Sequence, residues 1–181
     1  MRRLDKTLVL GGMMGAGKTS VGRRLAHVLG VPFRDADSEI ELAAGCTVNE
    51  IFERFGEPAF RAGERKVIAR LLCESPHILA TGGGAFMDEE TRARIKESAI
   101  SIWLKAPIEL LLERVMRKDT RPLLRNTDRR AALDRLLKER APVYAEADIT
   151  IESDDGPHDA AVKGIIAALD LRRVDEHETR S

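Results

Sequence analysis

A glycine-rich segment near the N-terminus has the composition of a polyphosphate-binding loop. In LVLGGMMGAGKT, residues 8–19, an apolar run leads into glycines, Lys18 and Thr19, and an amphipathic pattern follows directly. Glycines allow backbone N–H groups to turn toward a polyphosphate, while the following helix adds its dipole. Lys18 would reach the terminal phosphates, and Thr19 would bind the Mg²⁺ that they carry. A glycine turn without a ligand is the alternative, but every fixed position of the motif is filled.

Two aspartates follow the next short apolar segment, Val31-Pro32-Phe33. Asp35 and Asp37 are separated by one residue, so one carboxylate could face a metal and phosphate while the other faces a second substrate. The alternative is that Asp37 or Ser38 only caps the following helix, which is a common role for these residue types. The nearby phosphate loop favours a chemical role, because parallel sheets bind ligands at the carboxyl ends of their strands.

Gly82, Gly83 and Gly84 follow a third apolar segment, His77–Thr81. Three successive glycines are costly in backbone entropy, so the close approach of a ligand to the chain explains them better than an idle turn does. The idle turn remains an alternative.

Two arginines are candidates for binding an anion. Arg61 and Glu64 are three residues apart on one helix face, which could also be a surface ion pair of little energetic value. Arg140 continues the stripe of Leu133, Leu136 and Leu137 and should therefore point inward. A buried arginine needs an anion, which could be a ligand or a carboxylate of the protein.

Apolar segments that read as strands alternate with amphipathic helices along the whole chain. We predict strands near residues 8–11, 31–35, 77–81, 99–104 and 149–151, each followed by at least one helix, with two helices meeting at Gly56 and Pro58. This order is typical of an α/β fold with a parallel sheet. A polar and basic stretch with an internal proline, residues 118–128, reads as an exposed mobile loop.

Composition restricts the partners and the compartment. The 181 residues suit one domain, and 30 basic and 30 acidic side chains give zero formal net charge, which argues against nucleic acid or an anionic membrane as the main partner. The two cysteines form no disulfide framework. No apolar stretch has the length of a signal or a membrane span, so we expect a cytoplasmic protein.

Taken together, the motifs resemble those of shikimate kinases. GGMMGAGKTSVGRRLA, FRDAD, IFERFGEPAFRAGE, LATGGGA, TRPLL and KERAPVY occur in the family's order and at fitting distances, from about Thr7 to Leu169. The resemblance implies a three-layer α/β/α P-loop kinase fold with a five-stranded parallel sheet ordered 2-3-1-4-5 and a mobile lid. It also implies transfer of the γ-phosphate of ATP to the 3-hydroxyl of shikimate, with Mg²⁺ as cofactor.

The resemblance also implies a role for each matching residue. Asp37 would be the base that accepts the shikimate hydroxyl proton, with Lys18 and Arg121 stabilising the transferred phosphate. Thr19 and Asp35 would hold Mg²⁺. ATP would contact Gly15, Ala16, Gly17, Lys18, Thr19, Ser20, Arg114, on which adenine stacks, and Arg121. Shikimate would contact Asp37, Arg61, Gly82, Gly83, Gly84 and Arg140.

We therefore expect a single kinase domain over residues 1–174, with a lid at about 118–128 and an unstructured tail over 175–181. The expected ligands are shikimate and MgATP, and the expected state is a monomer. Two alternatives are a small-metabolite kinase of gluconate type on the same fold and a nucleotide-binding regulator without transfer activity. The resemblance decides against the first, and the joint presence of Asp37, Arg61, Arg121 and Arg140 argues against the second.

Overall fold

A five-stranded parallel sheet forms the centre of the computed structural model, which describes residues 4–117 and 128–178. The strands are β1 (Thr7–Gly11), β2 (Phe33–Asp35), β3 (Ile78–Ala80), β4 (Ala99–Lys105) and β5 (Ile149–Glu152). They lie in the order β2-β3-β1-β4-β5, and every pairing is parallel. The predicted fold class and strand order are confirmed.

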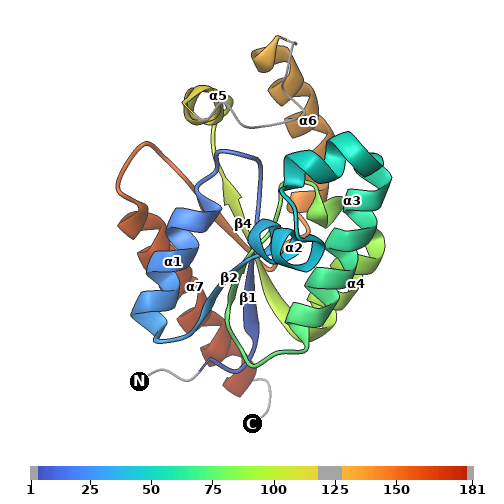
Figure 1. The fold of residues 1–181 in the computed structure, drawn as a ribbon. Helices are drawn as coiled ribbons and strands as arrows, with labels where there is room; N and C mark the ends of the chain where they lie inside the picture. The colour runs from blue at the N-terminus through green and yellow to red at the C-terminus, as the bar shows by residue number, and fades with distance from the viewer. Residues whose placement is uncertain (1–3, 118–127, 179–181) are drawn as a thin grey trace.

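Helices cover both faces of this sheet. They are α1 (Lys18–Leu29), α2 (Ala36–Ala44), α3 (Val48–Leu72), α4 (Glu89–Ser98), α5 (Ile108–Met116), α6 (Arg129–Tyr144) and α7 (His158–Glu178), with a short 3₁₀ helix, η1 (Ala85–Met87). Helices α1 and α7 lie on one side of the sheet and α3 and α4 on the other, while α5 and α6 stand beyond the ends of the strands (Figure 1).

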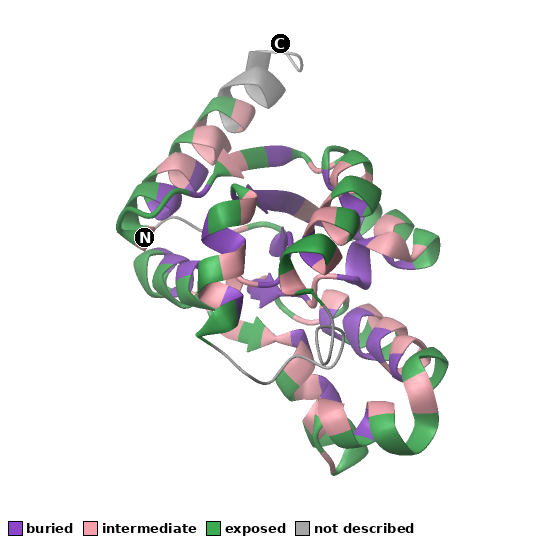
Figure 2. Cartoon of the chain, turned by 90° about the horizontal axis from the view of Figure 1, so that it is seen from above, coloured by how far each residue is buried: buried purple, intermediate pink, exposed green. Residues whose placement is uncertain are grey.

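Burial of β1 on both faces explains its position in the middle of the sheet. Leu8, Val9 and Leu10 are fully buried, which matches the continuous apolar run expected of a central parallel strand. Leu8 pairs with Ile78 of β3 on one side and with Ile100 of β4 on the other. Buried residues gather on the strands and on the helix faces turned toward them (Figure 2). The phosphate loop therefore directly follows a fully buried strand.

Capping residues set the first residues of helices α2 and α3. Asp35, rather than Asp37 or Ser38, is the N-cap of α2, because its carboxylate accepts hydrogen bonds from the N–H groups of Asp37 and Ser38. The capping interpretation of Asp37 and Ser38 is therefore wrong. Thr47 and Glu50 form the predicted capping box of α3.

Gly56 interrupts α3, as the two predicted helices meeting at Gly56 and Pro58 require. Its φ of 79° and ψ of 173° are not helical, so α3 is a short helix followed by a longer one at an angle. A φ in this range favours glycine, and Pro58 accepts the first turn of the second part because it needs no N–H donor there.

The C-terminal boundary predicted for the domain differs from the structure. Helix α7 continues to Glu178, whereas an unstructured tail was expected from residue 175. The expected lid, residues 118–128, lies outside the described residues up to residue 127, and so does Arg121. The last residue of this lid, Asp128, is described, and its carboxylate caps α6. Within the described ranges, no helix combines the length and the apolar character needed to cross a membrane.

Candidate active site

The loop between β1 and α1 has the backbone of a phosphate-binding loop. Gly12, Gly15 and Gly17 all have positive φ values, of 135°, 82° and 95°, which bulkier residues rarely adopt. The Lys18 ammonium donates hydrogen bonds of 2.8 Å to the carbonyl oxygens of Gly12 and Met13, across the mouth of the loop. Met13 itself is 2% exposed and packs into the core. The loop thus presents N–H groups and an ammonium at a helix N-terminus, which is a suitable site for an anion.

Thr19 and Asp35 meet at the end of β2 and are suited to a magnesium ion. The Thr19 hydroxyl donates a 2.9 Å hydrogen bond to Oδ2 of Asp35, while Oδ1 caps α2. Both groups are oxygen ligands, which Mg²⁺ prefers. Among residues 4–117 and 128–178, no three His, Cys, Asp or Glu side chains converge as a metal site. Phosphate oxygens and water would therefore have to supply the other ligands.

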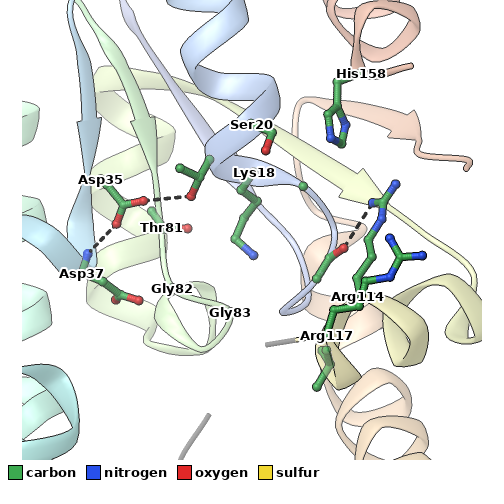
Figure 3. A pocket seen from close by; sticks show the side chains of 14 residues that line it. Lys18, Ser20, Asp35, Asp37, Thr81, Gly82, Gly83, Arg114, Arg117 and His158 are labelled. Atoms are coloured by element: carbon green, nitrogen blue, oxygen red, sulfur yellow. Dashed lines mark hydrogen bonds between the residues drawn. The ribbon is translucent and has the colours of Figure 1, made fainter. Parts of the chain in front are cut away.

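One cavity joins the phosphate loop to the first glycines of the glycine turn, Gly82–Gly84. It has a volume of about 320 Å³. Its lining comprises Gly15, Gly17, Lys18, Thr19, Ser20, Asp35, Asp37, Thr81, Gly82, Gly83, Arg114, Val115, Arg117 and His158. Lys18 lies between the two aspartates on one side and Arg114 on the other (Figure 3). Apart from Ala16, which is fully buried, and Arg121, which lies outside the described residues, the predicted phosphate, metal and base residues thus share one cavity at the carboxyl ends of β1, β2 and β3.

Arg114, Arg117 and His158 form the wall of the cavity opposite the aspartates. Arg114 donates hydrogen bonds to the carbonyl oxygens of Gly15 and Asp154, and so ties the phosphate loop to the β5–α7 connection. A methyl group added at Gly17 would lie 3.2 Å from the imidazole of His158. Burial, with the nearby charges of Arg114 and Arg24, lowers the pKa of His158. The sequence identified Arg114 but neither Arg117 nor His158, because His158 lies at the start of α7, 44 residues after Arg114, and nothing in the sequence places the two together.

The glycine turn is packed against charged side chains of the protein itself. A methyl group at Gly82 would lie 2.9 Å from Oε1 of Glu64 and 3.3 Å from Oδ1 of Asp37. At Gly83 it would lie 3.1 Å from Arg140, and at Gly84 2.6 Å from Nη1 of Arg61. Side chains from α2, α3 and α6 thus pack closely against this backbone, and their flexible ends would have to shift to admit a methyl group. Close approach of a ligand to the same backbone, the reason predicted for these glycines, stays a prediction.

Arg61 and Glu64 form an ion pair in which Glu64 is buried and Arg61 is partly exposed. Nη1 of Arg61 donates a 2.8 Å hydrogen bond to Oε2 of Glu64, which is only 3% exposed. Burial raises the pKa of Glu64, and the charge of Arg61 offsets part of this shift. Burial alone would lower the pKa of Arg61, but Glu64 and Glu57 outweigh it and leave the pKa raised. Oε1 of Glu64 is buried and has no hydrogen-bond partner in the described part of the chain.

Arg140 points inward, as predicted, and is 7% exposed. No carboxylate of the described residues lies within ion-pair distance of it, but its charge offsets part of the rise in the pKa of the buried Glu64. Arg140 lies against Gly83, and its charge acts on Tyr144, one helical turn further on, by offsetting part of the rise in the pKa of that phenol. The Tyr144 hydroxyl donates to the carbonyl oxygen of Gly83. Burial raises the pKa of Tyr144 to about 12, so the phenol stays protonated and able to donate.

The residues proposed for shikimate are divided between two cavities. Asp37, Gly82 and Gly83 line the first. Gly84 and the two arginines line a second, of about 360 Å³, together with Glu57, Glu64, Arg65, Met87, Asp88, Thr91 and Glu139. The glycine turn separates the two. Glu57, Glu64 and Tyr144 were not identified from the sequence as parts of this site; Tyr144, four residues after Arg140 on the same helix face, could have been.

Comparisons with known proteins agree with this arrangement. A family model described as shikimate kinase matches residues 14–170. The shikimate kinase of Caulobacter vibrioides strain NA1000 is 62% identical over 164 residues, covering 91% of this chain and 82% of that protein. The solved structure of the Acinetobacter baumannii shikimate kinase in complex with shikimate has a TM-score of 0.90 at 40% identity, covering 92% of this chain and 94% of that one. A gluconokinase from Sinorhizobium meliloti, with a TM-score of 0.63 at 19% identity over 99% of both chains, shares the fold.

Proposed function

The chain belongs to the shikimate kinase family, and we propose that it transfers the γ-phosphate of ATP to the 3-hydroxyl of shikimate. One observation carries the proposal. The phosphate loop and the carboxylate of Asp37 line the same cavity, and the glycine turn at its edge is packed against two inward-facing arginines. A phosphate donor and an anionic hydroxyl acceptor could therefore meet there.

The donor side binds and neutralises the phosphates. The N–H groups of Gly15, Ala16 and Gly17 and the ammonium of Lys18 would replace water around the phosphate oxygens. Lys18 exchanges its bonds to the loop carbonyls for bonds to phosphate. Ser20 and Arg114 complete the ATP contacts, with Arg114 against the adenine. Arg121, which lies outside the described residues, is proposed as a further phosphate ligand.

Mg²⁺ would be held by Thr19 and Asp35, whose oxygens already lie 2.9 Å apart. When bound, it supplies positive charge to the phosphate oxygens during transfer. Asp35 is fixed for this role because its other oxygen caps α2.

The acceptor side orients shikimate and takes its proton. Asp37 lies in the first turn of α2 and lines the cavity beside the phosphate loop. It would accept the proton of the attacking hydroxyl, while Arg61 and Arg140 bind the acceptor's carboxylate and Gly82, Gly83 and Gly84 approach its ring. Positioning and electrostatics supply most of the catalysis in phosphoryl transfer, so contributions from several segments are expected. We also propose that the enzyme acts as a monomer in the cytoplasm, without nucleic acid or membrane partners.

The test is transfer by the purified protein from MgATP to shikimate, quinate or gluconate, followed by ADP release and by ³¹P NMR of the product. We expect activity with shikimate and a phosphate ester at its 3-hydroxyl. Asp37→Asn should lower kcat by about 10²–10⁴-fold, the usual contribution of a general base.

Asp35→Asn is the matched control for Asp37→Asn. It should raise the Mg²⁺ concentration needed for half-maximal rate, and excess Mg²⁺ should partly rescue it. Rescue of Asp37→Asn by Mg²⁺ instead would reverse the two roles. Transfer to gluconate in preference to shikimate would reject the proposed substrate.

A further inference from the structure

Two carboxylates hold the guanidinium of Arg61. Glu64 accepts from Nη1 at 2.8 Å, while Oε1 of Glu57 accepts from Nε at 3.3 Å and from Nη2 at 3.2 Å. All three nitrogens of the guanidinium therefore already donate to a carboxylate of the protein. An acceptor carboxylate meets an arginine whose positive charge is already balanced by Glu57 and Glu64.

The two carboxylates differ in how easily they can leave. The side chain of Glu64 is 4% exposed and packs beneath the glycine turn, whereas that of Glu57 is 50% exposed. Glu57 directly follows Gly56, where α3 is interrupted, and its bonds to Arg61 are the longer ones. Water can replace Arg61 around Glu57 at little cost, but not around Glu64.

Arg140 provides the contrast. It lines the same cavity as Arg61, and no carboxylate of the described residues pairs with it. An anionic acceptor can bind Arg140 directly, but it can reach the Nε and Nη2 side of Arg61 only by replacing Glu57.

We propose that Glu57 competes with the carboxylate of the acceptor for Arg61 and thereby raises the Kd and the KM for the acceptor. This inference rests on the proposed function, in which Arg61 binds that carboxylate. Glu57 acts through Arg61 and is thus a residue that sets affinity, not a catalytic one. Its loss should change KM for shikimate and leave kcat unchanged.

The experiment compares Glu57→Gln with Glu139→Gln by calorimetric titration of shikimate without nucleotide, and by steady-state kinetics. Glu139 is an exposed carboxylate on the same cavity that makes no contact with Arg61, so its replacement changes the charge equally. We expect Glu57→Gln to lower Kd and KM about threefold to fivefold, the range of an exposed ion pair. Glu139→Gln should change them less than about twofold.

The methyl ester of shikimate gives a second readout, because it lacks the charge that would compete. Its KM should be the same for wild type and Glu57→Gln. Weaker or unchanged shikimate binding in Glu57→Gln would overturn the inference, since Glu57 would then orient Arg61 or do nothing. Equal tightening in Glu139→Gln would also overturn it, in favour of a general field effect. Wild-type protein that does not bind shikimate would overturn the proposed function itself, and this inference with it.

Discussion

The acceptor region around Glu64 and the junction of β4 with β5 around Asp148 each contain a carboxylate beside an arginine. At the junction, Oδ2 of Asp148 accepts from the N–H and hydroxyl of Ser101, and Oδ1 accepts from Arg172. These bonds outweigh the effect of burial and lower the pKa of Asp148. In the acceptor region, burial dominates and raises the pKa of Glu64, of which one oxygen has no partner in the described chain.

The opposite pKa shifts mean that the charge of Asp148 stabilises the fold, whereas the charge of Glu64 reduces its stability. Asp148 joins two strands and has its hydrogen bonds satisfied by the protein. Glu64 is held under the glycine turn with an unsatisfied oxygen, and such groups occur where a site is organised for a ligand. The two networks should therefore respond in opposite ways to mutation and to pH.

The largest expected difference is between the arginines of the acceptor region, Arg61 and Arg140, and Arg172 at the junction of β4 with β5. Arg61→Ala removes a charge-assisted contact worth about 2–3 kcal/mol, so KM for shikimate should rise about 30- to 100-fold with KM for ATP little changed. Arg140→Ala should do the same. Arg172→Ala, at the junction, should leave both KM values within about twofold of wild type and cost at most about 1 kcal/mol of stability. Steady-state kinetics decides; equal KM effects at both places would remove the distinction.

Gly84→Ala tests whether the glycine turn needs the space that Arg61 occupies. The φ of Gly84 is −93°, so alanine fits the backbone, but its methyl group would lie 2.6 Å from Nη1 of Arg61. Displacement of the guanidinium should raise KM for shikimate about tenfold. Gly63→Ala is the control: a methyl group there meets open space in a helix, and stability should rise by about 0.5–1 kcal/mol with unchanged kinetics. A normal KM in Gly84→Ala would mean that Arg61 is not needed in its present position.

Asp148→Asn should destabilise the fold. A lowered carboxyl pKa adds stability above the unfolded value of about 3.9, and this stability is lost as the pH falls through the lower folded value. We expect a loss of about 1–1.5 kcal/mol at neutral pH in urea unfolding, narrowing as the pH falls below about 4. A constant difference at both pH values would show that lost packing, not charge, causes the effect.

Glu64→Gln should have the smallest effect on stability and the opposite sign. A raised carboxyl pKa adds stability below the unfolded value of about 4.3, and this is lost as the pH rises through the folded value. At neutral pH the variant should therefore be as stable as wild type or up to about 1 kcal/mol more stable, and the gain should vanish near pH 4. A marked loss of stability at neutral pH would place Glu64 in the same class as Asp148.

The donor side of the site could be predicted from the sequence because its residues are adjacent in the chain. The phosphate loop, Lys18 and Thr19 lie in one segment, and the alternation of strands and helices was sufficient for a parallel sheet. The resemblance to shikimate kinases supplied the strand order. Arg140 was predicted to point inward because a leucine stripe precedes it on the same helix.

The acceptor side was predicted less completely, because its contacts join segments far apart in the sequence. Spacing placed Glu64 on the same face as Arg61 but could not show that the glycine turn buries it. The reason for Gly82, Gly83 and Gly84 was sought in a ligand, whereas side chains from three helices already occupy the space. The cap of α2 was considered only for Asp37 or Ser38, as an alternative to a chemical role, whereas Asp35 is the cap, because local sequence does not fix where a short strand ends.

The central position of β1 has a consequence for the order in which the protein becomes functional during synthesis. The phosphate loop leaves the ribosome before the strands that flank β1, because Leu8 pairs with Ile78 and Ile100, much later in the chain. Contacts so distant in sequence form slowly, because a long loop must close first. Nucleotide binding by a nascent chain should therefore begin only after β4 has emerged, so a chain truncated before residue 99 should bind no ATP despite carrying the whole loop.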